Sequence, residues 1–222
     1  MPRFVRENAL TLSLVGLFAL SLAGQAVAGW SVYNDEQAEH AQAEISFGEY
    51  LTTGHFGEAV FENWESEFLQ MGLFVLLTAR LRQKGSPESK PLEEGSSHST
   101  DRAPDPRKPD APWPVHRGGW VLRVYEHSLS IALLALFALS FALHVVNGAT
   151  ELSAEEALHG GGAVSPLAYL GTSTLWFESF QNWQSEFMSI AALAVLSIFL
   201  RERGSSQSKP VDAPHSQTGE AT

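Results

Sequence analysis

The sequence contains no cysteine among its 222 residues. Disulfides, thiolate catalysis, cysteine-ligated metals and covalently attached c-type haem are therefore excluded. It also shows no phosphate-binding loop, no metal-binding His-x-x-x-His pattern and no nucleophile beside a base. Glu36 and His40 have the spacing of a metal pair, but a solvated acidic helix face is the preferred interpretation because the second half of the chain lacks it. We therefore expect no enzyme, no metal site and no cofactor.

Positive charge is missing from most of the chain. Residues 31–79 and residues 124–200 contain no lysine or arginine, although the chain has 14 of them and a net charge of −11. A soluble acidic protein spreads its lysines over every face, so this confinement indicates membrane topology. The cations fall in three groups: Arg3 and Arg6; then Arg80, Arg82, Lys84, Lys90, Arg102, Arg107, Lys108, Arg117 and Arg123; then Arg201, Arg203 and Lys209.

Four apolar stretches lie between these groups, at about residues 9–30, 61–81, 127–147 and 175–200. Each has close to the ~20 residues that a helix needs to cross a bilayer. Because cations stay on the cytoplasmic side, both termini and the central basic segment are expected inside, with outer loops at 31–60 and 148–174. The outer loops are rich in carboxylates, which disfavours nucleic acid as a partner. The sequence thus predicts an all-α integral protein of the cell (inner or plasma) membrane, with the lipid bilayer as its partner.

The chain repeats itself. The hexapeptide Asn-Trp-Glu-Ser-Glu-Phe at residues 63–68 returns 119 residues later as Asn-Trp-Gln-Ser-Glu-Phe at 182–187, and matches continue on both sides of it. This predicts a tandem duplication of a two-helix hairpin, with repeat 1 at 1–84 and repeat 2 at 118–203. Since both hairpins leave the cytoplasm and return, the repeats are expected to be parallel, related by a pseudo-twofold axis along the membrane normal.

The segments between and after the repeats have a different composition. The linker at 85–117 is rich in proline, serine and acidic residues, so it is predicted to be disordered, and the tail at 204–222 likewise. In the outer loops, residues 35–43 are expected to form a short polar helix of their own. A capping-box pattern beginning at Ser153 predicts the start of another, which the glycines at 160–162 would end.

The first apolar stretch also allows a second interpretation. Arg3 and Arg6 precede an apolar run that ends in Ala26-Val27-Ala28, as in a cleavable signal peptide. The repeat argues for retention, because the counterpart of this stretch lies in the middle of the chain. Cleavage would also leave an odd number of spans.

Polar residues at the outer ends of the spans form the candidate site. On the second span, Asn63, Ser66 and Glu67 fall on one helical face, and the second copy repeats this division. Gln25 and its counterpart His144 lie at a comparable depth on the first and third spans. The predicted intramembrane cluster consists of Gln25, Asn63, Ser66, Glu67, His144, Asn182, Ser185 and Glu186. Such residues serve either as interhelical hydrogen bonds, the preferred interpretation, or as an ion or proton route.

Tryptophans mark the outer ends of the predicted spans. Trp30, Trp64, Trp176 and Trp183 are expected to act as interfacial anchors or packing residues.

Four motifs give a family resemblance: Arg6-Glu7-Asn8, Gly24-Gln25-Ala26, Asn63-Trp64-Glu65-Ser66-Glu67 and Gly85-Ser86-Pro87-Glu88-Ser89-Lys90. With them the chain resembles, over nearly its whole length, an uncharacterised family of small bacterial membrane proteins that carry a domain of unknown function. The resemblance implies a multi-pass membrane protein and no assigned activity, substrate or cofactor. A structural, stress-related or partner-binding membrane protein is therefore expected. The alternative is a small proton or cation channel or transporter that uses Glu67, Glu186 and His144, most simply as a homodimer.

Overall fold

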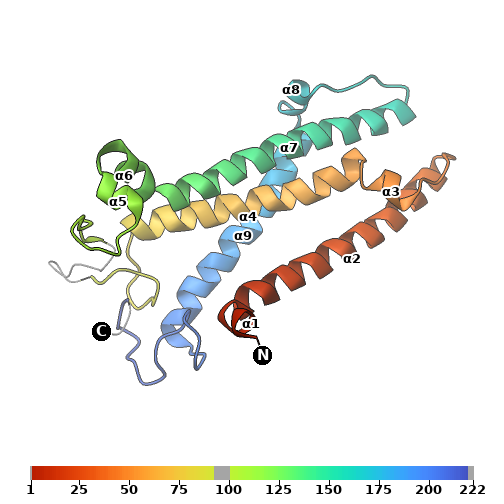
Figure 1. Ribbon diagram of the computed structural model, residues 1–222. Coiled ribbons are helices and arrows are strands. Elements are labelled where there is room, and N and C mark those ends of the chain that lie inside the picture. The colour runs from red at the N-terminus through yellow and green to blue at the C-terminus, as the bar shows by residue number, and fades with distance from the viewer. Residues whose placement is uncertain (1, 93–100, 220–222) are drawn as a thin grey trace. The chain divides into compact units, whose positions relative to one another are not determined.

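The computed structural model describes residues 2–92 and 101–219, and every regular element within them is a helix (Figure 1). Four of these helices are long: α2 (Ala9–Glu39), α4 (Gly54–Arg80), α7 (Ser128–Leu158) and α9 (Ser173–Phe199). The short ones are α1 (Arg3–Glu7), α3 (Phe47–Tyr50), α5 (Trp113–Arg117), α6 (Gly119–Glu126) and α8 (Pro166–Tyr169).

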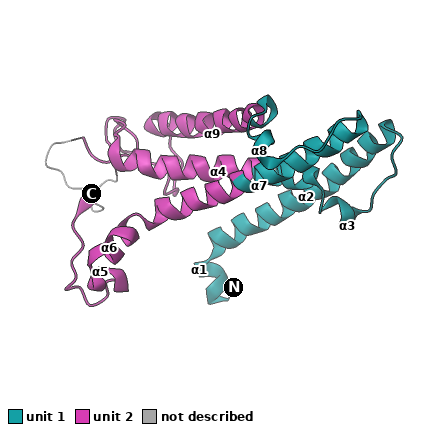
Figure 2. Cartoon of the chain, turned by 90° about the horizontal axis from the view of Figure 1, so that it is seen from above, with its two compact units in different colours: residues 1–61, 142–175 teal, residues 62–141, 176–222 magenta. Residues whose placement is uncertain are grey.

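The chain forms two compact units, coloured separately in Figure 2. Unit 1 comprises residues 1–61 and 142–175, and unit 2 comprises residues 62–141 and 176–222. Each unit therefore takes segments from both halves of the sequence. The helices α4, α7 and α9 contribute residues to both.

The helices α2 and α7 extend beyond the predicted spans, to Glu39 and Leu158. The expected separate helix at 35–43 is therefore wrong, because most of it is the last turn of α2. The expected helix start at Ser153 is also wrong, because Ser153 lies inside α7. Its hydroxyl donates to the Ala149 carbonyl at 2.5 Å and accepts from the Val164 backbone N–H at 2.8 Å, so it fastens the following loop.

A capping box is present instead at Ser46, in the first of the predicted outer loops. Ser46 caps α3, and the Glu49 carboxylate accepts in return from the Ser46 backbone N–H at 2.8 Å. The chain leaves α2 through Ala41 and α7 through Gly160, both with positive φ (56° and 78°). At Gly160 the left-handed conformation ends the helix where the glycine run predicted.

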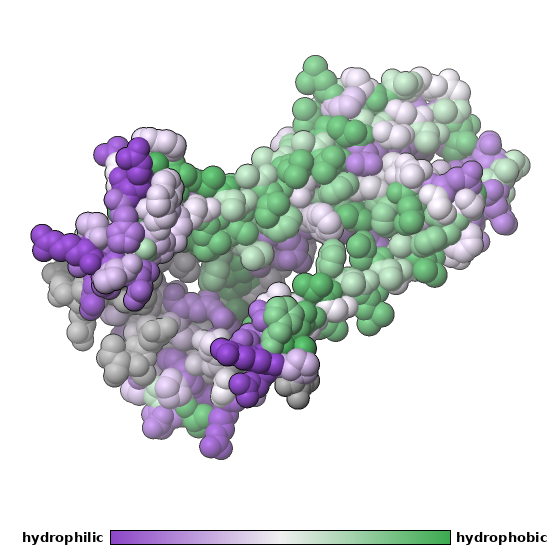
Figure 3. Space-filling view, viewed as in Figure 1, coloured by the Kyte–Doolittle hydropathy of each residue, from purple (hydrophilic) through white to green (hydrophobic). Residues whose placement is uncertain are grey.

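Two of the described helices, α2 and α7, are long and apolar enough to cross a membrane. The other two predicted spans fall within α4 and α9, which carry polar side chains in their first halves. Large apolar side chains of α2 and α7 are exposed, among them Leu10, Leu20, Leu129 and Leu139. In Figure 3 the hydrophobic colouring follows the long helices, while the hydrophilic colouring gathers at the short helices and loops.

Local hydrogen bonds recur at the spacing of 119 residues. Asn34 accepts from the Ile45 backbone N–H at 2.8 Å, and Ser153, 119 residues later, accepts from Val164 at the same distance. Thr53 donates to the Tyr50 carbonyl and Thr172 to the Tyr169 carbonyl, both at 2.7 Å. Beyond α4 and α9, Arg82 donates to Pro91 at 3.0 Å and Arg201 to Pro210 at 3.2 Å. Corresponding positions therefore have corresponding local structure.

Candidate functional site

Three acidic residues of α4 stand out by position. Glu58, Glu62 and Glu65 follow one another at spacings of four and three residues, which places them on one face of the helix. Each accepts a hydrogen bond from a polar side chain of another element. Glu58 belongs to unit 1, whereas Glu62 and Glu65 belong to unit 2.

In unit 1 the carboxylate of Glu58 meets His144 and Tyr169. The Tyr169 hydroxyl donates to Glu58 Oε1 at 2.8 Å, and a ring nitrogen of His144 lies within 4.8 Å of a Glu58 carboxylate oxygen. His144 and Tyr169 are completely buried, and their rings meet edge to face with centroids 6.5 Å apart. We name these three residues the Glu58 cluster. It combines a carboxylate, an imidazole and a phenol hydroxyl.

Glycines make room for this cluster. A Cβ placed on Gly148 would lie 2.5 Å from Glu58 Oε1 and 2.5 Å from the Tyr169 ring. On α4, a Cβ on Gly54 would lie 2.6 Å from the Glu151 backbone nitrogen, and one on Gly57 would lie 2.1 Å from Asn147 Oδ1. Real Cβ atoms do not approach so closely, so these glycines allow the start of α4 to pack directly on α7 in unit 1.

One turn earlier on α4, His55 connects to a second polar group. Its Nδ1 lies 3.1 Å from the Tyr50 hydroxyl, and its ring contacts that of Tyr33 with centroids 5.4 Å apart. Its backbone N–H donates to the Glu151 carboxylate. Burial raises the pKa of Glu151, and the nearby Glu36 and Glu155 carboxylates raise it further. The charge of His55 and the hydrogen bond from its backbone oppose this rise. Burial also raises the pKa values of Tyr33 and Tyr50.

Glu151 opens onto a cavity of about 510 Å³ between α2 and α7, lined in part by Tyr33, Glu36, His40 and Glu155. We call it the outer cavity, since all of its lining lies in or beside the predicted outer loops. His40 at its edge contacts His159, with ring centroids 5.9 Å apart. Glu36 and His40, weighed above as a metal pair, thus line a solvated acidic cavity.

In unit 2 the acidic face of α4 meets α9. Glu65 is completely buried and accepts from the Ser179 hydroxyl at 2.8 Å, while Asn182 Nδ2 donates to the Glu62 carboxylate. The Gln70 amide donates to the Glu186 carbonyl at 3.5 Å. These are interhelical hydrogen bonds of the kind that join helices in lipid, each worth about 0.6 to 2 kcal/mol.

The residues of the predicted cluster are placed differently. Ser66 and Ser185 each donate to a carbonyl of their own helix, at 2.8 Å. Glu67 and Glu186 are close enough for their charges to interact. His144 and the exposed Gln25 belong to unit 1, and Asn63, Ser66, Glu67, Asn182, Ser185 and Glu186 belong to unit 2. The functional role of the set stays a prediction.

Two of the predicted tryptophan anchors, Trp30 and Trp183, have defined contacts: Trp30 makes a hydrogen bond and Trp183 packs against aromatic rings. Trp30 Nε1 donates to the Ile45 carbonyl at 2.8 Å. Trp183 packs between Phe137 and Phe180, with centroid distances of 6.4 and 5.4 Å, and its indole nitrogen is buried without a hydrogen-bond partner. Trp183 is therefore a packing residue of unit 2.

Sequence reasoning did not single out a second polar face of α4. It followed the stripe through Asn63, Ser66 and Glu67, whereas the acids bonded to other elements are Glu58, Glu62 and Glu65. The signal for the second face was present in their i, i+4, i+7 spacing. The matched pair Tyr50 and Tyr169 was visible in the repeat as well, and both side chains are buried.

The Glu58 cluster also has the ligand types of a metal site. A carboxylate and an imidazole supply two of the three or four protein ligands that a zinc ion takes.

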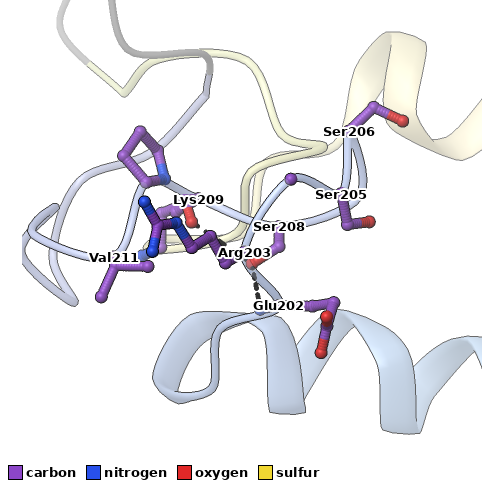
Figure 4. Close-up of a pocket in the computed structure, with 9 residues that line it drawn as sticks. Glu202, Arg203, Ser205, Ser206, Ser208, Lys209 and Val211 are labelled. Carbon is purple, nitrogen blue, oxygen red and sulfur yellow. Dashed lines mark hydrogen bonds between the residues drawn. The ribbon is translucent and has the colours of Figure 1, made fainter.

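A hollow of about 680 Å³ lies in the C-terminal segment, between Glu202 and Val211 (Figure 4). Its one buried cation, Lys209, is held by backbone carbonyls: its Nζ donates to Gly85 at 2.6 Å, His215 at 3.0 Å and Gln217 at 3.2 Å. Burial lowers the pKa of Lys209, and the Arg201 charge lowers it further. The ammonium is thus engaged in tying the tail to the Gly85 turn and is not offered to a ligand.

A protein-family model described as a domain of unknown function (DUF6766) matches residues 1–220. The searches of curated proteins and of solved structures found no match.

Proposed function

Because the chain belongs to the DUF6766 family, whose description assigns no activity, we propose from its geometry that it is a multi-pass integral membrane protein. One observation carries the proposal: α7 lies in the middle of the chain, is apolar over a membrane-spanning length, and only 22% of its most apolar window is buried. A core helix of a soluble protein would bury that surface. Lipid would cover it.

The full topology that we propose has four spans in two matching, parallel hairpins, with both termini and the linker in the cytoplasm. It is supported by the absence of cations from 31–79 and 124–200, and by the hydrogen bonds that recur 119 residues apart. On this view α4 and α9 cross the membrane with their polar first halves directed to the outer side. The first span is retained, as its mid-chain counterpart favours.

Within this topology we assign a structural or partner-binding role, which includes a stress-related one, rather than catalysis. Supporting it, the buried Glu65 and the half-buried Glu58 and Glu62 of α4 accept hydrogen bonds from Ser179, Tyr169 and Asn182, as helix-joining groups do. The partners proposed are the lipid bilayer, a second copy of the chain or another membrane protein, and no nucleic acid.

A second candidate function is a proton or cation pathway. It is favoured by ionisable groups at membrane depth, namely Glu58 beside His144 in unit 1 and Glu67 beside Glu186 in unit 2. Flux recorded in liposomes from the wild type and from the Glu67→Gln, Glu186→Gln double variant separates the two. Flux that disappears in a folded double variant supports the pathway, and its absence from both proteins supports the structural role.

The topology is tested by cysteine labelling, for which the chain needs no prior substitution because it contains no cysteine. Single variants Gly162→Cys in the second outer loop, Asp105→Cys in the linker and Ser216→Cys in the tail are treated with a membrane-impermeant maleimide on intact cells. We expect labelling of the first alone, and of all three after permeabilisation. Labelling of the linker or tail variant on intact cells would refute the proposed orientation.

A further inference from the structure

A short helix stands before each of the two membrane-length helices. α1 precedes α2 with only Asn8 between them, and α6 precedes α7 with only His127 between them. These two residues correspond in the repeat and have nearly the same backbone conformation, with φ and ψ of −120° and 19° at Asn8 and −113° and 8° at His127. Their carbonyls accept from the backbone N–H groups of Leu12 and Ile131, at 3.0 and 2.9 Å. The helix is therefore interrupted at the same point of both halves, just before an apolar helix begins.

Before α7 the chain adds a second short helix and exposes aromatic side chains. α5 and α6 contact each other beside the start of α7 (Figure 1), and we call residues 113–126 the α5–α6 segment. Trp113 is 66% exposed, Trp120 is 75% exposed and Val124 is 49% exposed. Trp120 and Val124 are i and i+4 on α6, so they share one face of that helix. Tryptophan is largely buried in most proteins, so this exposed apolar face marks an interaction surface.

The charge of the α5–α6 segment is opposite in sign to that of the whole chain. Residues 113–125 contain Arg117 and Arg123 and no carboxylate, whereas the chain has a net charge of −11. Both arginines are exposed, and Arg123 follows Trp120 by three positions, which places it beside the apolar face. A guanidinium binds phosphate oxygens through paired hydrogen bonds. Aromatic and basic side chains together on an amphipathic helix are typical of a helix that lies in the plane of a membrane surface.

We propose that the α5–α6 segment lies in the headgroup layer of the cytoplasmic leaflet and binds anionic phospholipids. Trp113, Trp120 and Val124 enter the boundary with the acyl chains, and Arg117 and Arg123 bind lipid phosphate. The inference rests on the proposed membrane function, since it needs α7 to cross the bilayer and to begin on the cytoplasmic side.

The choice of lipid over a soluble protein partner follows from the continuity of the chain. A single residue joins α6 to α7, so a spanning α7 keeps α6 at the membrane surface. α6 has eight residues, so its far end lies at most about 12 Å from the inner end of the span. An exposed tryptophan face this close to the bilayer is within reach of lipid in every copy of the protein.

Quenching by lipid tests whether the segment lies in the bilayer. A fluorophore is attached to Val124→Cys, or to Asp105→Cys in the linker, in the full-length protein, which contains no other cysteine. Each protein is reconstituted in vesicles of phosphatidylcholine, or of phosphatidylcholine mixed with phosphatidylglycerol, that contain a lipid with a nitroxide quencher near its headgroup. We expect quenching at position 124 to be at least about twofold stronger than at position 105, and to be stronger in the anionic vesicles than in the neutral ones.

The two arginines are tested with a matched change of charge. Arg117→Gln combined with Arg123→Gln should lower the quenching at position 124 in anionic vesicles to its level in phosphatidylcholine alone. The physical reason is that each arginine near an anionic surface strengthens attachment roughly fivefold. Arg3→Gln combined with Arg6→Gln removes the same charge at the other short helix and should leave this quenching unchanged. Circular dichroism verifies that both variants are folded.

Three results would count against these proposals, and they differ from one another. Quenching at position 124 no stronger than at position 105, in vesicles that retain the protein, would overturn the inference in favour of a soluble partner. Equal quenching in both kinds of vesicle, unchanged by the loss of Arg117 and Arg123, would overturn the binding of anionic lipid. Release of the wild type from vesicles by alkaline carbonate would instead refute the proposed membrane function.

Discussion

At the scale of single residues, Gly148 leaves the space that the Glu58 cluster occupies. The backbone of α7 passes so close to Glu58 and Tyr169 that any side chain at this position would displace both. The cluster thus requires a residue without a Cβ at position 148 as well as its own polar groups.

Gly148→Ala is expected to destabilise the protein by about 1 to 3 kcal/mol, because the new Cβ overlaps ring carbons of Tyr169 that backbone packing holds in place. Gly24→Ala in α2 is the matched control, since nothing lies within 4 Å of the added Cβ. It should be neutral or stabilise by roughly 0.5 to 1 kcal/mol through helix propensity. Thermal unfolding of both in one detergent measures the difference, and equal melting temperatures would contradict the geometry at Gly148.

Two carboxylates should change the free energy of unfolding with pH in opposite directions. The pKa of Glu151 is raised, chiefly by burial, so its contribution to stability is present below the ordinary value near 4.3 and is lost as pH rises through the raised pKa. The pKa of Glu49 is lowered by the Ser46 hydroxyl and backbone, so its contribution is present above the ordinary value and is lost as pH falls. Glu151→Gln should remove a decline in the free energy of unfolding above about pH 4.3. Glu49→Gln should remove a decline in the free energy of unfolding below about pH 4.3. Matching pH profiles for the two variants would show that one of these shifts is wrong.

At the scale of elements, polar side chains near the ends of α2 and α7 fasten the loops that follow. Asn34 and Ser153 occupy corresponding positions and bond to Ile45 and Val164. We expect Asn34→Ala and Ser153→Ala each to cost about 1 kcal/mol and to speed hydrogen exchange at their own loop amide, Ile45 or Val164, and not at the other. Mass spectrometry of deuterated peptides measures this, and a common response in both loops would mean that the two fasteners do not act separately.

The sequence predicts the elements that local composition determines, but it does not predict the details that contacts with other elements determine. The long helices lie near the predicted apolar runs, because an uninterrupted run of that length has few other conformations. The extensions to Glu39 and Leu158 were missed, since Ser153 suits a helix cap as well as a tertiary hydrogen bond, and only its contact with Val164 decides between them. For the same reason His144 was found as a candidate, while Glu58 and Glu65 were not. The choice between two polar faces of α4 depends on which neighbours they meet.

At the scale of the whole molecule, the C-terminal segment is tied to a turn more than 120 residues earlier in the chain. Lys209 donates to Gly85, the Gly85 N–H donates to the Thr218 hydroxyl at 2.8 Å, and the Gly219 N–H donates to Ser86 at 3.0 Å. The predicted disorder of this tail stays a prediction, and these contacts give a way to measure it.

Lys209→Met removes the ammonium and leaves its carbonyl partners without their donor. If the tail is held as described, we expect protease cleavage within residues 210–219 to become several-fold faster, since protection reports local opening. Ser206→Ala, an exposed change in the same segment, is the control. Fast cleavage of the wild type, unchanged in both variants, would instead confirm the predicted disorder.

Unit 1 draws residues 1–61 from one half of the chain and residues 142–175 from the other, and the Glu58 cluster divides in the same way. Glu58 comes from the first half, and His144 and Tyr169 come from the second. If the gene were cut within the linker, neither fragment would hold all three residues of the cluster, although each would carry one of the two proposed hairpins. The two polypeptides would have to associate to restore the cluster, so the covalent link supplies a pairing that two separate genes would otherwise have to regulate.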